Sequence, residues 1–331
     1  MDKTRRIKIG IVGVGYIGTV HISSYQAHPL CEVVAICDVN EKLLKEMQTK
    51  FNVPRAYTNQ QEMQEKEELD GIVIATPDEY HRKPVEVAAA AGLPIMLEKP
   101  IATNMVDAEA IVKAAEDAKV MIMLGFTLRW IPQYVEMHNQ VAAGTLGQIT
   151  NAFARRACRL SEGRRLYGRC SVNQYLAVHD MDFLLWCMGR DVESIYSTKG
   201  DFVLKPEINT ADYYWNVIKW KNGATGVVHA SWCEPSGYNN YVEMQVILNG
   251  TKAGNHMLLA GQQYSLATET EYLTPEPSLN ATYPTEAAHF VDCIRLNKRP
   301  LAGWQEGIDT LKLLLAAEQS IADGQPVKVS L

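Results

Sequence analysis

The sequence predicts an α/β protein in which a doubly wound parallel sheet is followed by a second α/β domain. Three observations predict this fold. Short apolar runs alternate with helix-like segments over residues 1–125, a glycine-rich loop follows the first run, and residues 126–331 contain extended runs joined by hairpin-type turns. Strand–helix alternation is typical of parallel sheets, whereas hairpin turns join antiparallel strands. We therefore expect two domains, residues 1–125 and residues 126–331.

The expected strands of the first domain are continuous runs rich in Val, Ile and Leu. Such runs suit strands that are buried on both faces of a parallel sheet. They cover residues 7–12, 33–37, 71–75, 94–97 and 120–124. Between them, residues 40–50, 79–91 and 104–118 have the apolar spacing of amphipathic helices.

The second domain has a different pattern of predicted helices and strands. Helices are expected at residues 131–143, 173–188, 285–296 and 305–322, and extended segments at 149–158, 192–202, 211–220, 224–232, 241–248 and 251–260. The turns KNG (221–223) and LNG (248–250) separate neighbouring segments. They predict antiparallel pairing.

The composition excludes several classes of protein. Of the 331 residues, 47% are apolar and 21% are charged, and the formal net charge is −6, which argues against a nucleic-acid surface. We recognise no signal peptide and no run of about 18 apolar residues for a membrane span. The 7 scattered cysteines fit reduced thiols better than disulfides or a zinc site. We expect a soluble cytoplasmic protein.

The glycine loop is the first chemical signal. In IKIGIVGVGYIG, Gly13, Gly15 and Gly18 form G-x-G-x-x-G between a strand and a helix. This pattern allows a tight turn, close approach of a pyrophosphate and close helix–strand packing. Asp38 lies 20 residues after Gly18, where a carboxylate takes ribose hydroxyls. Asp38 would repel a 2′-phosphate, so NAD is preferred over NADP. The alternative is a structural turn followed by a solvated Asp.

The stretch LPIMLEKP, residues 93–100, is a second signal. Ligands of open α/β sheets bind beyond the carboxyl ends of the strands, and this strand ends in Glu98, Lys99 and Pro100. A lysine at that edge hydrogen-bonds a hydroxyl or carbonyl oxygen, and Glu98 holds it or contacts the cofactor. The alternative is a strand end with surface charges.

Together these motifs resemble the glucose–fructose oxidoreductase / inositol dehydrogenase / MocA family, called Gfo/Idh/MocA. The likeness runs over nearly the whole chain. It comprises GVGYIG, ATPDEYH (75–81), EKP (98–100), GFTLRW (125–130), HDMD (179–182), YPTEAAHFVDCI (283–294) and GWQEGIDTLKLLLAAEQS. The resemblance implies a Rossmann domain followed by an α/β domain with a large, open, mostly antiparallel sheet. It also implies a homodimer or homotetramer that forms through that sheet.

The resemblance also implies residue roles. Thr76 and Pro77 line the nicotinamide pocket, while Glu98 and Lys99 lie at the boundary of cofactor and substrate. Lys99 contacts the reacting oxygen and His179 is the general acid/base. Three further residues within the quoted motifs are assigned to the cofactor site: Tyr16, Ile17 and His81.

His179 is also supported by its helix. Asp182 lies 3 residues later and hence on the same face, where a carboxylate orients an imidazole and raises its pKa. A lone histidine on such a helix is otherwise more often structural. The inositol dehydrogenase branch has an Asp one turn before this His, whereas this chain has Tyr175, which weakens any assignment to inositol. Thr127 stands where many relatives have Asn.

Two further features bear on the substrate. Six arginines lie between Arg155 and Arg169, and we include Arg156 among the substrate-binding residues because arginine suits carboxylates and phosphates. A solvated loop or a subunit contact is the simpler interpretation. Tyr283, 3 residues before Glu286, matches a family position that often faces substrate, although core packing competes with it. Tyr175 and Asp182 complete the candidate substrate residues.

We therefore expect an NAD-dependent oxidoreductase that transfers a hydride to or from a secondary hydroxyl of a sugar, polyol or sugar acid. No metal is expected, because a hydride carried by nicotinamide needs none. We expect no nucleic-acid or membrane partner. One rival is an NAD-dependent glycoside hydrolase, which returns the hydride within each turnover. The other is a non-enzymatic sugar or dinucleotide sensor.

Overall fold

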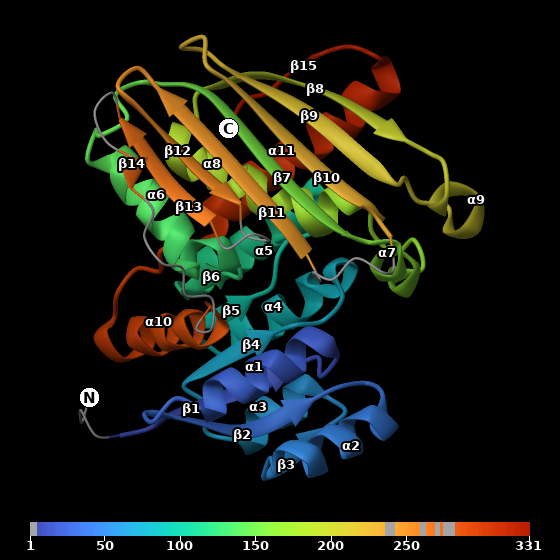
Figure 1. Cartoon of the computed structure of the whole chain (residues 1–331). Helices are drawn as coiled ribbons and strands as arrows, with labels where there is room; N and C mark the ends of the chain where they lie inside the picture. The colour runs from blue at the N-terminus through green and yellow to red at the C-terminus, as the bar shows by residue number, and fades with distance from the viewer. Residues whose placement is uncertain (1–4, 236–241, 259–262, 269–271, 274–281) are drawn as a thin grey trace. The chain divides into compact units, whose positions relative to one another are not determined.

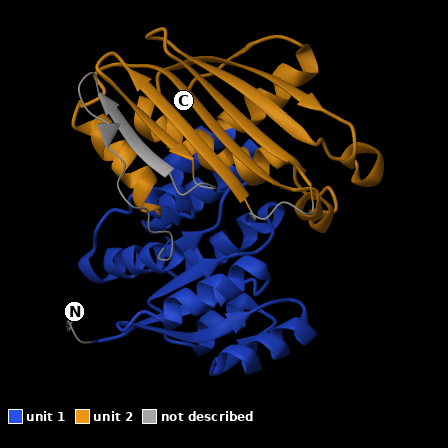
Figure 2. Ribbon diagram, in the orientation of Figure 1, with its two compact units in different colours: residues 1–130, 281–311 blue, residues 131–280, 312–331 orange. Residues whose placement is uncertain are grey.

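The chain forms two compact units. The computed structural model describes residues 5–235, 242–258, 263–268, 272–273 and 282–331. The first unit is Met1–Trp130 with Ala281–Leu311, and the second is Ile131–Asn280 with Lys312–Leu331 (Figure 2). The first unit therefore includes a segment from near the C-terminus, which the division at residue 125 did not anticipate.

The sheet of the first unit has six parallel strands in the order β3-β2-β1-β4-β5-β6. This is the strand order of a Rossmann fold, in which the direction of winding reverses between β1 and β4. The predicted parallel sheet is confirmed. The strands are β1 (Ile7–Val12), β2 (Cys31–Cys37), β3 (Arg55–Tyr57), β4 (Gly71–Ile74), β5 (Ile95–Leu97) and β6 (Ile122–Leu124).

The helices of this unit begin with recognisable signals. Asn40, Asn59 and Asn104 each accept a backbone N–H of the first turn that follows them. The helices are α1 (Tyr16–Gln26), α2 (Glu41–Phe51), α3 (Gln60–Lys66), α4 (Arg82–Ala90), α5 (Met105–Ala118) and α10 (Thr282–Leu296), with 3-10 turns η1 (Asp78–Tyr80) and η2 (Thr127–Trp130). The last helix, α11 (Trp304–Asp323), belongs in part to each unit.

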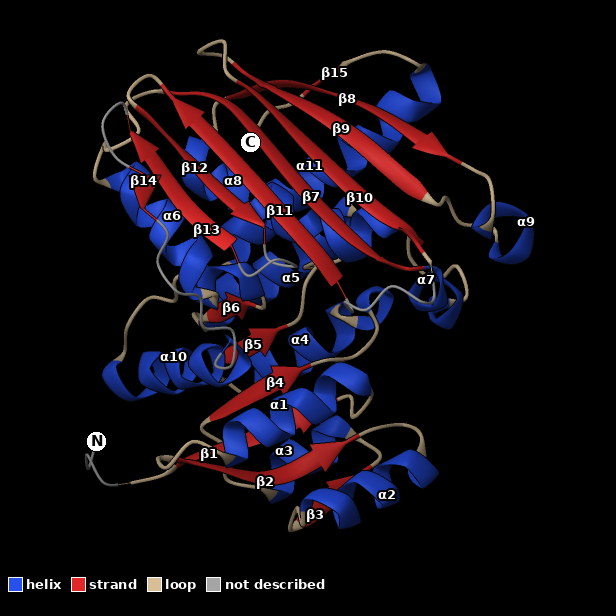
Figure 3. Ribbon diagram, viewed as in Figure 1, coloured by secondary structure: helices blue, strands red, loops and turns tan. Residues whose placement is uncertain are grey.

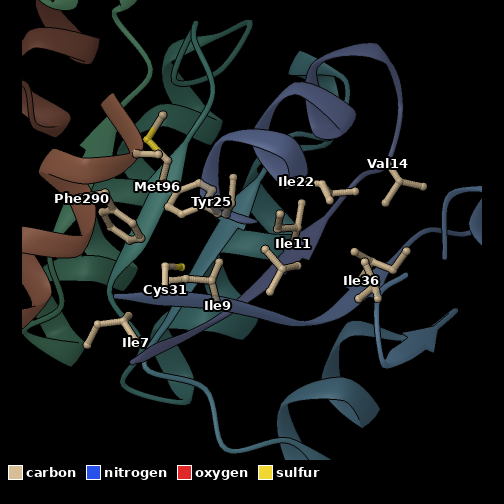
Figure 4. Packing of buried hydrophobic residues seen from close by; sticks show 14 of the residues in the cluster. Ile7, Ile9, Ile11, Val14, Ile22, Tyr25, Cys31, Ile36, Met96 and Phe290 are labelled. Atoms are coloured by element: carbon tan, nitrogen blue, oxygen red, sulfur yellow. The ribbon is translucent and has the colours of Figure 1, made fainter. Parts of the chain in front are cut away.

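Helix α10 explains why the chain returns to the first unit. Phe290 is fully buried and belongs to the same apolar cluster as Ile9, Tyr25 and Met96 (Figure 4). Its ring lies edge-on to Tyr25 of α1, at a centroid distance of 6.3 Å. Burial of a phenylalanine side chain contributes about 2–3 kcal/mol. The segment is therefore an integral part of the core.

The second unit is built on a nine-stranded sheet, in the order β14-β13-β12-β11-β7-β10-β9-β8-β15 (Figures 1 and 3). All neighbouring pairs are antiparallel except β7 and β10, so the predicted, mostly antiparallel sheet is confirmed. The strands are β7 (Ile149–Arg159), β8 (Val192–Gly200), β9 (Tyr213–Trp220), β10 (Thr225–Glu234), β11 (Val242–Gly250), β12 (Ala253–Leu258), β13 (Gln263–Thr268), β14 (Tyr272–Leu273) and β15 (Val327–Lys328).

One face of this sheet carries helices. Helix α8 packs on β7 and β10, and Ser320 of α11 accepts the backbone N–H of Ser197 on β8. The opposite face presents Trp215 and Val217 of β9 and Tyr196 of β8, each more than a third exposed. The helices are α6 (Pro132–Ala142), α7 (Leu160–Leu166), α8 (Val178–Met188) and α9 (Leu204–Ile208).

Most differences from the expected elements are local. The helix expected at residues 173–188 begins instead with a π-helical turn, η3 (Asn173–Ala177), which passes into α8. The short elements β3, α7, α9 and β15 were not predicted, since each is too short to show a period. Both predicted hairpins, β9–β10 and β11–β12, are confirmed. Within the described residues, no helix has the length and apolar character that a membrane span requires.

Candidate active site

The glycine loop joins β1 to α1, and its glycines meet different surroundings. Gly13 has a φ of +88°, and a Cβ there would lie 2.6 Å from the carbonyl oxygen of Ala75. A Cβ at Gly18 would collide with the carbonyl oxygen of Gly13. At Gly15, by contrast, a Cβ would meet no described atom within 4 Å. Gly13 and Gly18 are thus required by the fold, whereas Gly15 leaves space on the outer side of the loop.

The start of α1 has no side-chain cap, unlike the starts of α2, α3 and α5. Its N-cap residue is Gly15, which has no side chain to accept a first-turn N–H, whereas asparagines cap α2, α3 and α5. The first N–H groups of a helix and its dipole attract anions. The open space at Gly15 therefore fits a pyrophosphate at this helix end.

Asp38 follows β2 and faces the loop. Its Oδ2 accepts the backbone N–H of Val14 at 2.9 Å, and its Oδ1 accepts that of Asn40 at 2.8 Å. These bonds fix the carboxylate beside the glycine loop, which is the position predicted from the spacing. A carboxylate oxygen has more than one acceptor lone pair, so Asp38 can still accept ribose hydroxyls.

A cavity of about 700 Å³ lies over this part of the sheet edge. Its lining includes Gly13 and Asp38, which the sequence assigned to the pyrophosphate turn and the ribose, together with Thr76 and Pro77, which the sequence assigned to the nicotinamide pocket. Most of its exposed lining is apolar, and its volume is in the range of small-molecule sites. Donors at the loop, a carboxylate and apolar walls together fit the adenosine half of NAD.

His81 is placed differently from the other predicted cofactor residues. It is fully buried, with Nδ1 2.9 Å from the carbonyl oxygen of Pro100 and Nε2 3.1 Å from that of Thr76. Burial lowers the pKa of His81. The buried ring lies between the backbone carbonyls of Thr76 and Pro100, the latter in the Glu-Lys-Pro turn. Tyr16, in the first turn of α1, is 63% exposed, and Ile17 is half-buried.

The Glu-Lys-Pro turn lies at the same sheet edge. Strands β1, β4 and β5 are adjacent and parallel, so Gly13, Thr76 and Lys99 follow strand ends that lie side by side. Lys99 is half-buried, and its peptide bond to Pro100 is cis. Lys99 therefore occupies the edge where ligands of such sheets bind.

Glu98 points into the unit. Its Oε1 lies 2.8 Å from Nε2 of His21 on α1, and its Oε2 accepts the backbone N–H of Lys99 at 3.2 Å. Burial raises the pKa of Glu98, but the hydrogen bond and charge of His21 and the charge of Lys99 outweigh it, so the pKa lies below its usual value. The carboxylate is therefore ionised at pH 7. The sequence identified Glu98 but missed His21.

Helix α10 adds two residues beside this pair. The ring of Tyr283 lies edge-on to His21 at a centroid distance of 6.1 Å, and Glu286 is 1% exposed. Burial, with the charge of Glu98, raises the pKa of Glu286 well above its usual value. Trp130 offsets this only in part, since its indole N–H does not reach hydrogen-bonding geometry with Glu286. Glu286 therefore keeps its proton to a higher pH than an ordinary glutamic acid.

In the second unit, His179 lies in the first turn of α8, directly after the π-helical turn. His179 is half-buried and Asp182 is 1% exposed, while the neighbouring Asp180 is fully buried. Single π turns recur at functional sites. This one directly precedes the helical turn that carries His179.

Tyr175 lies within the π-helical turn. Its hydroxyl accepts a hydrogen bond from Nη2 of Arg165 at 3.1 Å, and its ring packs on Trp232 at a centroid distance of 5.4 Å. Arg165 also forms an ion pair with Glu162. The phenol that stands in place of the inositol-branch Asp is therefore held by an arginine.

Arg156 is buried in an ion pair with Asp180. Its Nε and Nη2 donate to the two carboxylate oxygens at 2.9 and 3.2 Å, and Nη2 lies 3.4 Å from the hydroxyl of Tyr134. Arg155 pairs with Glu234 and Glu243, Arg164 with Glu207, and Arg165 with Glu162. Four of the six arginines thus already have carboxylate partners within this unit.

Comparison with known proteins identifies the family of the chain. Residues 7–126 match the family described as "Oxidoreductase family, NAD-binding Rossmann fold", and residues 134–254 match the "GFO/IDH/MocA C-terminal domain". The chain belongs to the Gfo/Idh/MocA family. This confirms the resemblance, and the description of the N-terminal domain confirms NAD as the cofactor predicted from the glycine loop and Asp38.

Relatives in this family match along the whole chain. The myo-inositol 2-dehydrogenase of Thermotoga maritima is 26% identical over 98% of both chains. The D-apiose dehydrogenase of Paraburkholderia graminis is 25% identical over 98% of this chain and 90% of its own. A levoglucosan dehydrogenase, solved in complex with NADH and levoglucosan, superposes with a TM-score of 0.89 at 19% identity, covering 99% of this chain and 100% of its own. At that identity the structural match shows the shared fold.

Among the described residues, no three or more His, Cys, Asp or Glu side chains gather as a metal site would require. Of the predicted cofactor residues, Gly13, Asp38, Thr76 and Pro77 line one cavity of the first unit, whereas Gly15, Tyr16, Ile17, Gly18, His81, Glu98 and Lys99 are not among its lining residues. The residues of the second unit that the sequence predicted as catalytic or substrate-binding lie on or beside α8.

Proposed function

We propose that the chain is an NAD-dependent dehydrogenase of a sugar or polyol, in which Lys99 and His179 handle the proton of the reacting hydroxyl. The observation that carries this proposal is the set of strand ends at one edge of the Rossmann sheet. There, the Gly15 opening and Asp38 fit NAD, and Lys99 follows the adjacent strand β5. When bound, NAD supplies a nicotinamide that accepts a hydride from the substrate carbon.

The proposed roles follow from the chemistry of the side chains. The Lys99 ammonium donates to the substrate oxygen and stabilises negative charge there as the hydroxyl loses its proton. His179 accepts that proton, since an imidazole titrates near neutral pH. The buried Glu98 carboxylate binds the backbone N–H of Lys99 and holds the turn in place.

A neutral sugar or polyol is the substrate that the observations support best. The named relatives are dehydrogenases of inositol and of apiose. Four of the six arginines that suggested an anionic substrate have carboxylate partners. Uronates remain in the test as the alternative.

The experiment follows NADH absorbance with the purified chain, NAD or NADP, and a panel of inositols, aldoses, uronates and glycosides. We expect NADH to form from NAD with a polyol or sugar. The rate should fall at least 100-fold in Lys99→Ala and His179→Ala, since general acid–base groups contribute about 10²–10⁴-fold to the rate. Lys113→Ala, an exposed lysine of α5, is the matched control and retains activity.

Two other outcomes would replace the proposal. Cleavage of a chromogenic glycoside with bound NAD and no net NADH would identify the glycoside hydrolase. Binding of NAD and sugar without turnover on any substrate, at wild-type folding, would identify a sensor.

We also propose that the chain forms a homo-oligomer through the nine-stranded sheet and acts in the cytoplasm. Tyr196 and Val217 are cross-strand partners, and Trp215 shares their face, so exposed apolar side chains gather on one side of β8 and β9. Such gatherings mark interfaces in soluble proteins. Light scattering of wild type and Trp215→Glu tests the assembly, and cell fractionation tests the compartment.

A further inference from the structure

The Glu98 cluster is a group of polar side chains buried within the first unit, behind the Glu-Lys-Pro turn. Its members come from α1, from the end of β5 and from α10. His21 and Glu286 are each 1% exposed, and Glu98 is 7% exposed. The cluster comprises His21, Tyr25, Glu98, Tyr283 and Glu286.

The contacts in the cluster run from His21 to the backbone of Lys99. Nε2 of His21 lies 2.8 Å from Oε1 of Glu98, and because a carboxylate only accepts, this nitrogen carries the hydrogen. The rings of Tyr25 and Tyr283 pack at 6.1 Å from the imidazole, at interplanar angles of 33° and 89°, and fix its orientation. The other carboxylate oxygen, Oε2, accepts the N–H of Lys99 at 3.2 Å. One carboxylate thus couples the imidazole to the backbone that carries the proposed catalytic lysine.

The two carboxyls of the cluster, Glu98 and Glu286, differ in how readily they ionise. The groups that face Glu98 are His21 and Tyr25 from α1, His81, Lys99 and, from α10, Glu286. Two carboxyls that share a buried site do not both ionise readily. Glu98 has donors from His21 and Lys99, whereas neither oxygen of Glu286 accepts a hydrogen bond from any described residue. Glu98 is therefore the carboxyl that ionises first, and Glu286 is the one that keeps its proton to higher pH.

We propose that His21 is a positioning residue for the dehydrogenase reaction: through its bond to Glu98 it keeps that carboxylate ionised and so holds the backbone and the ammonium of Lys99 in place. The kinetic consequence rests on the proposed function, whereas the bond between His21 and Glu98 does not. Without the imidazole donor, the buried Glu98 keeps only the weaker 3.2 Å contact to Lys99 and takes up a proton at higher pH.

The kinetic test compares His21→Leu with His21→Gln in the full-length protein. Leucine removes the donor, whereas the glutamine amide retains one. We expect His21→Leu to lower kcat about 10-fold or more, to leave KM for NAD within about twofold, and to move the acidic limb of the kcat/KM profile to higher pH. The expected loss matches about 1.5 kcal/mol for a charge-assisted hydrogen bond. His21→Gln restores most of kcat and the position of the limb.

His28→Gln is the matched control, because His28 lies just after α1 and outside the cluster, and its activity and profile should equal those of wild type. If leucine and glutamine at position 21 reduce kcat equally with an unmoved acidic limb, His21 is merely structural and the inference is overturned.

A second readout does not depend on turnover. The side-chain carboxyl ¹³C resonance of Glu98, assigned with Glu98→Gln, is titrated in wild type and in His21→Leu. We expect an ionised resonance throughout the neutral range in wild type and a midpoint at higher pH in His21→Leu. An unmoved midpoint overturns the inference even if the protein is a dehydrogenase. If the midpoint moves and no alcohol is oxidised, the proposed function fails and the coupling between His21 and Glu98 stands.

Discussion

The carboxylate of Asp38 and the backbone N–H of Val14 are joined by a hydrogen bond of 2.9 Å, which ties the end of β2 to the glycine loop. In Asp38→Asn the amide oxygen can still accept the N–H of Val14, whereas the amide nitrogen cannot accept that of Asn40, so the loop keeps its bond to the end of β2 while the charge is lost. We expect Kd for NAD to rise about 10-fold or more, since hydrogen bonds to charged groups contribute about 1.5–3 kcal/mol. NADP should lose less affinity, because the repulsion of its 2′-phosphate is removed. Calorimetric titration with both dinucleotides measures the change, and Asp117→Asn on the exposed end of α5 serves as the control.

The two glycines of the loop separate folding from cofactor binding. Gly13→Ala places a Cβ against the Ala75 carbonyl at a φ of +88°, so we expect the melting temperature to fall by several degrees. Gly15→Ala places a Cβ where no described atom lies within 4 Å, so the melting temperature should stay within about 1 °C of wild type. NAD affinity should nevertheless fall at least 10-fold, because the methyl group occupies the space proposed for the pyrophosphate. A Gly15→Ala variant that binds NAD normally would place the pyrophosphate elsewhere.

Glu286 should make stability depend on pH. Its pKa is raised in the folded chain by burial and by Glu98, so the unfolded chain releases this proton at a lower pH than the folded chain. The contribution of Glu286 to the free energy of unfolding is fully present below the ordinary pKa of about 4.5. It decreases as pH rises, by up to about 1.4 kcal/mol per pH unit. We expect Glu286→Gln to be more stable than wild type at pH 8, with a difference that shrinks toward pH 5. Urea unfolding at several pH values tests this, with Glu109→Gln, an exposed site on α5, as the control. Equal stabilities at every pH would show that Glu286 titrates normally.

Removing one partner of the Arg156–Asp180 ion pair should destabilise the protein strongly. Replacing both partners with apolar residues should destabilise it much less. Arg156→Met leaves the fully buried Asp180 carboxylate without its ion-pair partner, so we expect a loss of about 3–5 kcal/mol. Arg156→Met combined with Asp180→Leu removes both charges and should recover most of that loss. Arg164→Met, which breaks the exposed pair with Glu207, should leave the urea midpoint unchanged. Tight binding of uronates that disappears in Arg156→Met, in a folded protein, would instead support a substrate role for this arginine.

The sequence predicted the parts of the fold that follow from local patterns. Buried strands such as β1 are continuous apolar runs, and the KNG turn joins two alternating strands, so both the parallel and the antiparallel sheet could be predicted. Strand β3 could not, because three residues at the edge of a sheet show no period. The π-helical turn before His179 has the apolar spacing of an ordinary helix. Only the packing of the folded chain selects the wider turn.

The candidate site could be predicted where a motif fixes the backbone. The spacing of Gly13, Gly15 and Asp38 reflects one loop and one strand end, which are close in sequence and in space. His21 was missed because its partner, Glu98, lies 77 residues away and a histidine within α1 has no distinguishing pattern. The partners of Arg156 and Arg165 were missed for the same reason, so the cluster of arginines suggested more free positive charge than the fold retains.

The return of α10 to the first unit has a consequence for synthesis of the protein. The ribosome releases Ile9 and Tyr25 long before Phe290, which completes the core around them, has been translated. Part of the apolar surface of the nascent Rossmann segment therefore stays uncovered until residues 131–280 of the second unit have been translated. Such exposed surface is a substrate for chaperones. A chain halted at Trp130 would carry every glycine of the cofactor loop and still lack part of the core beneath it.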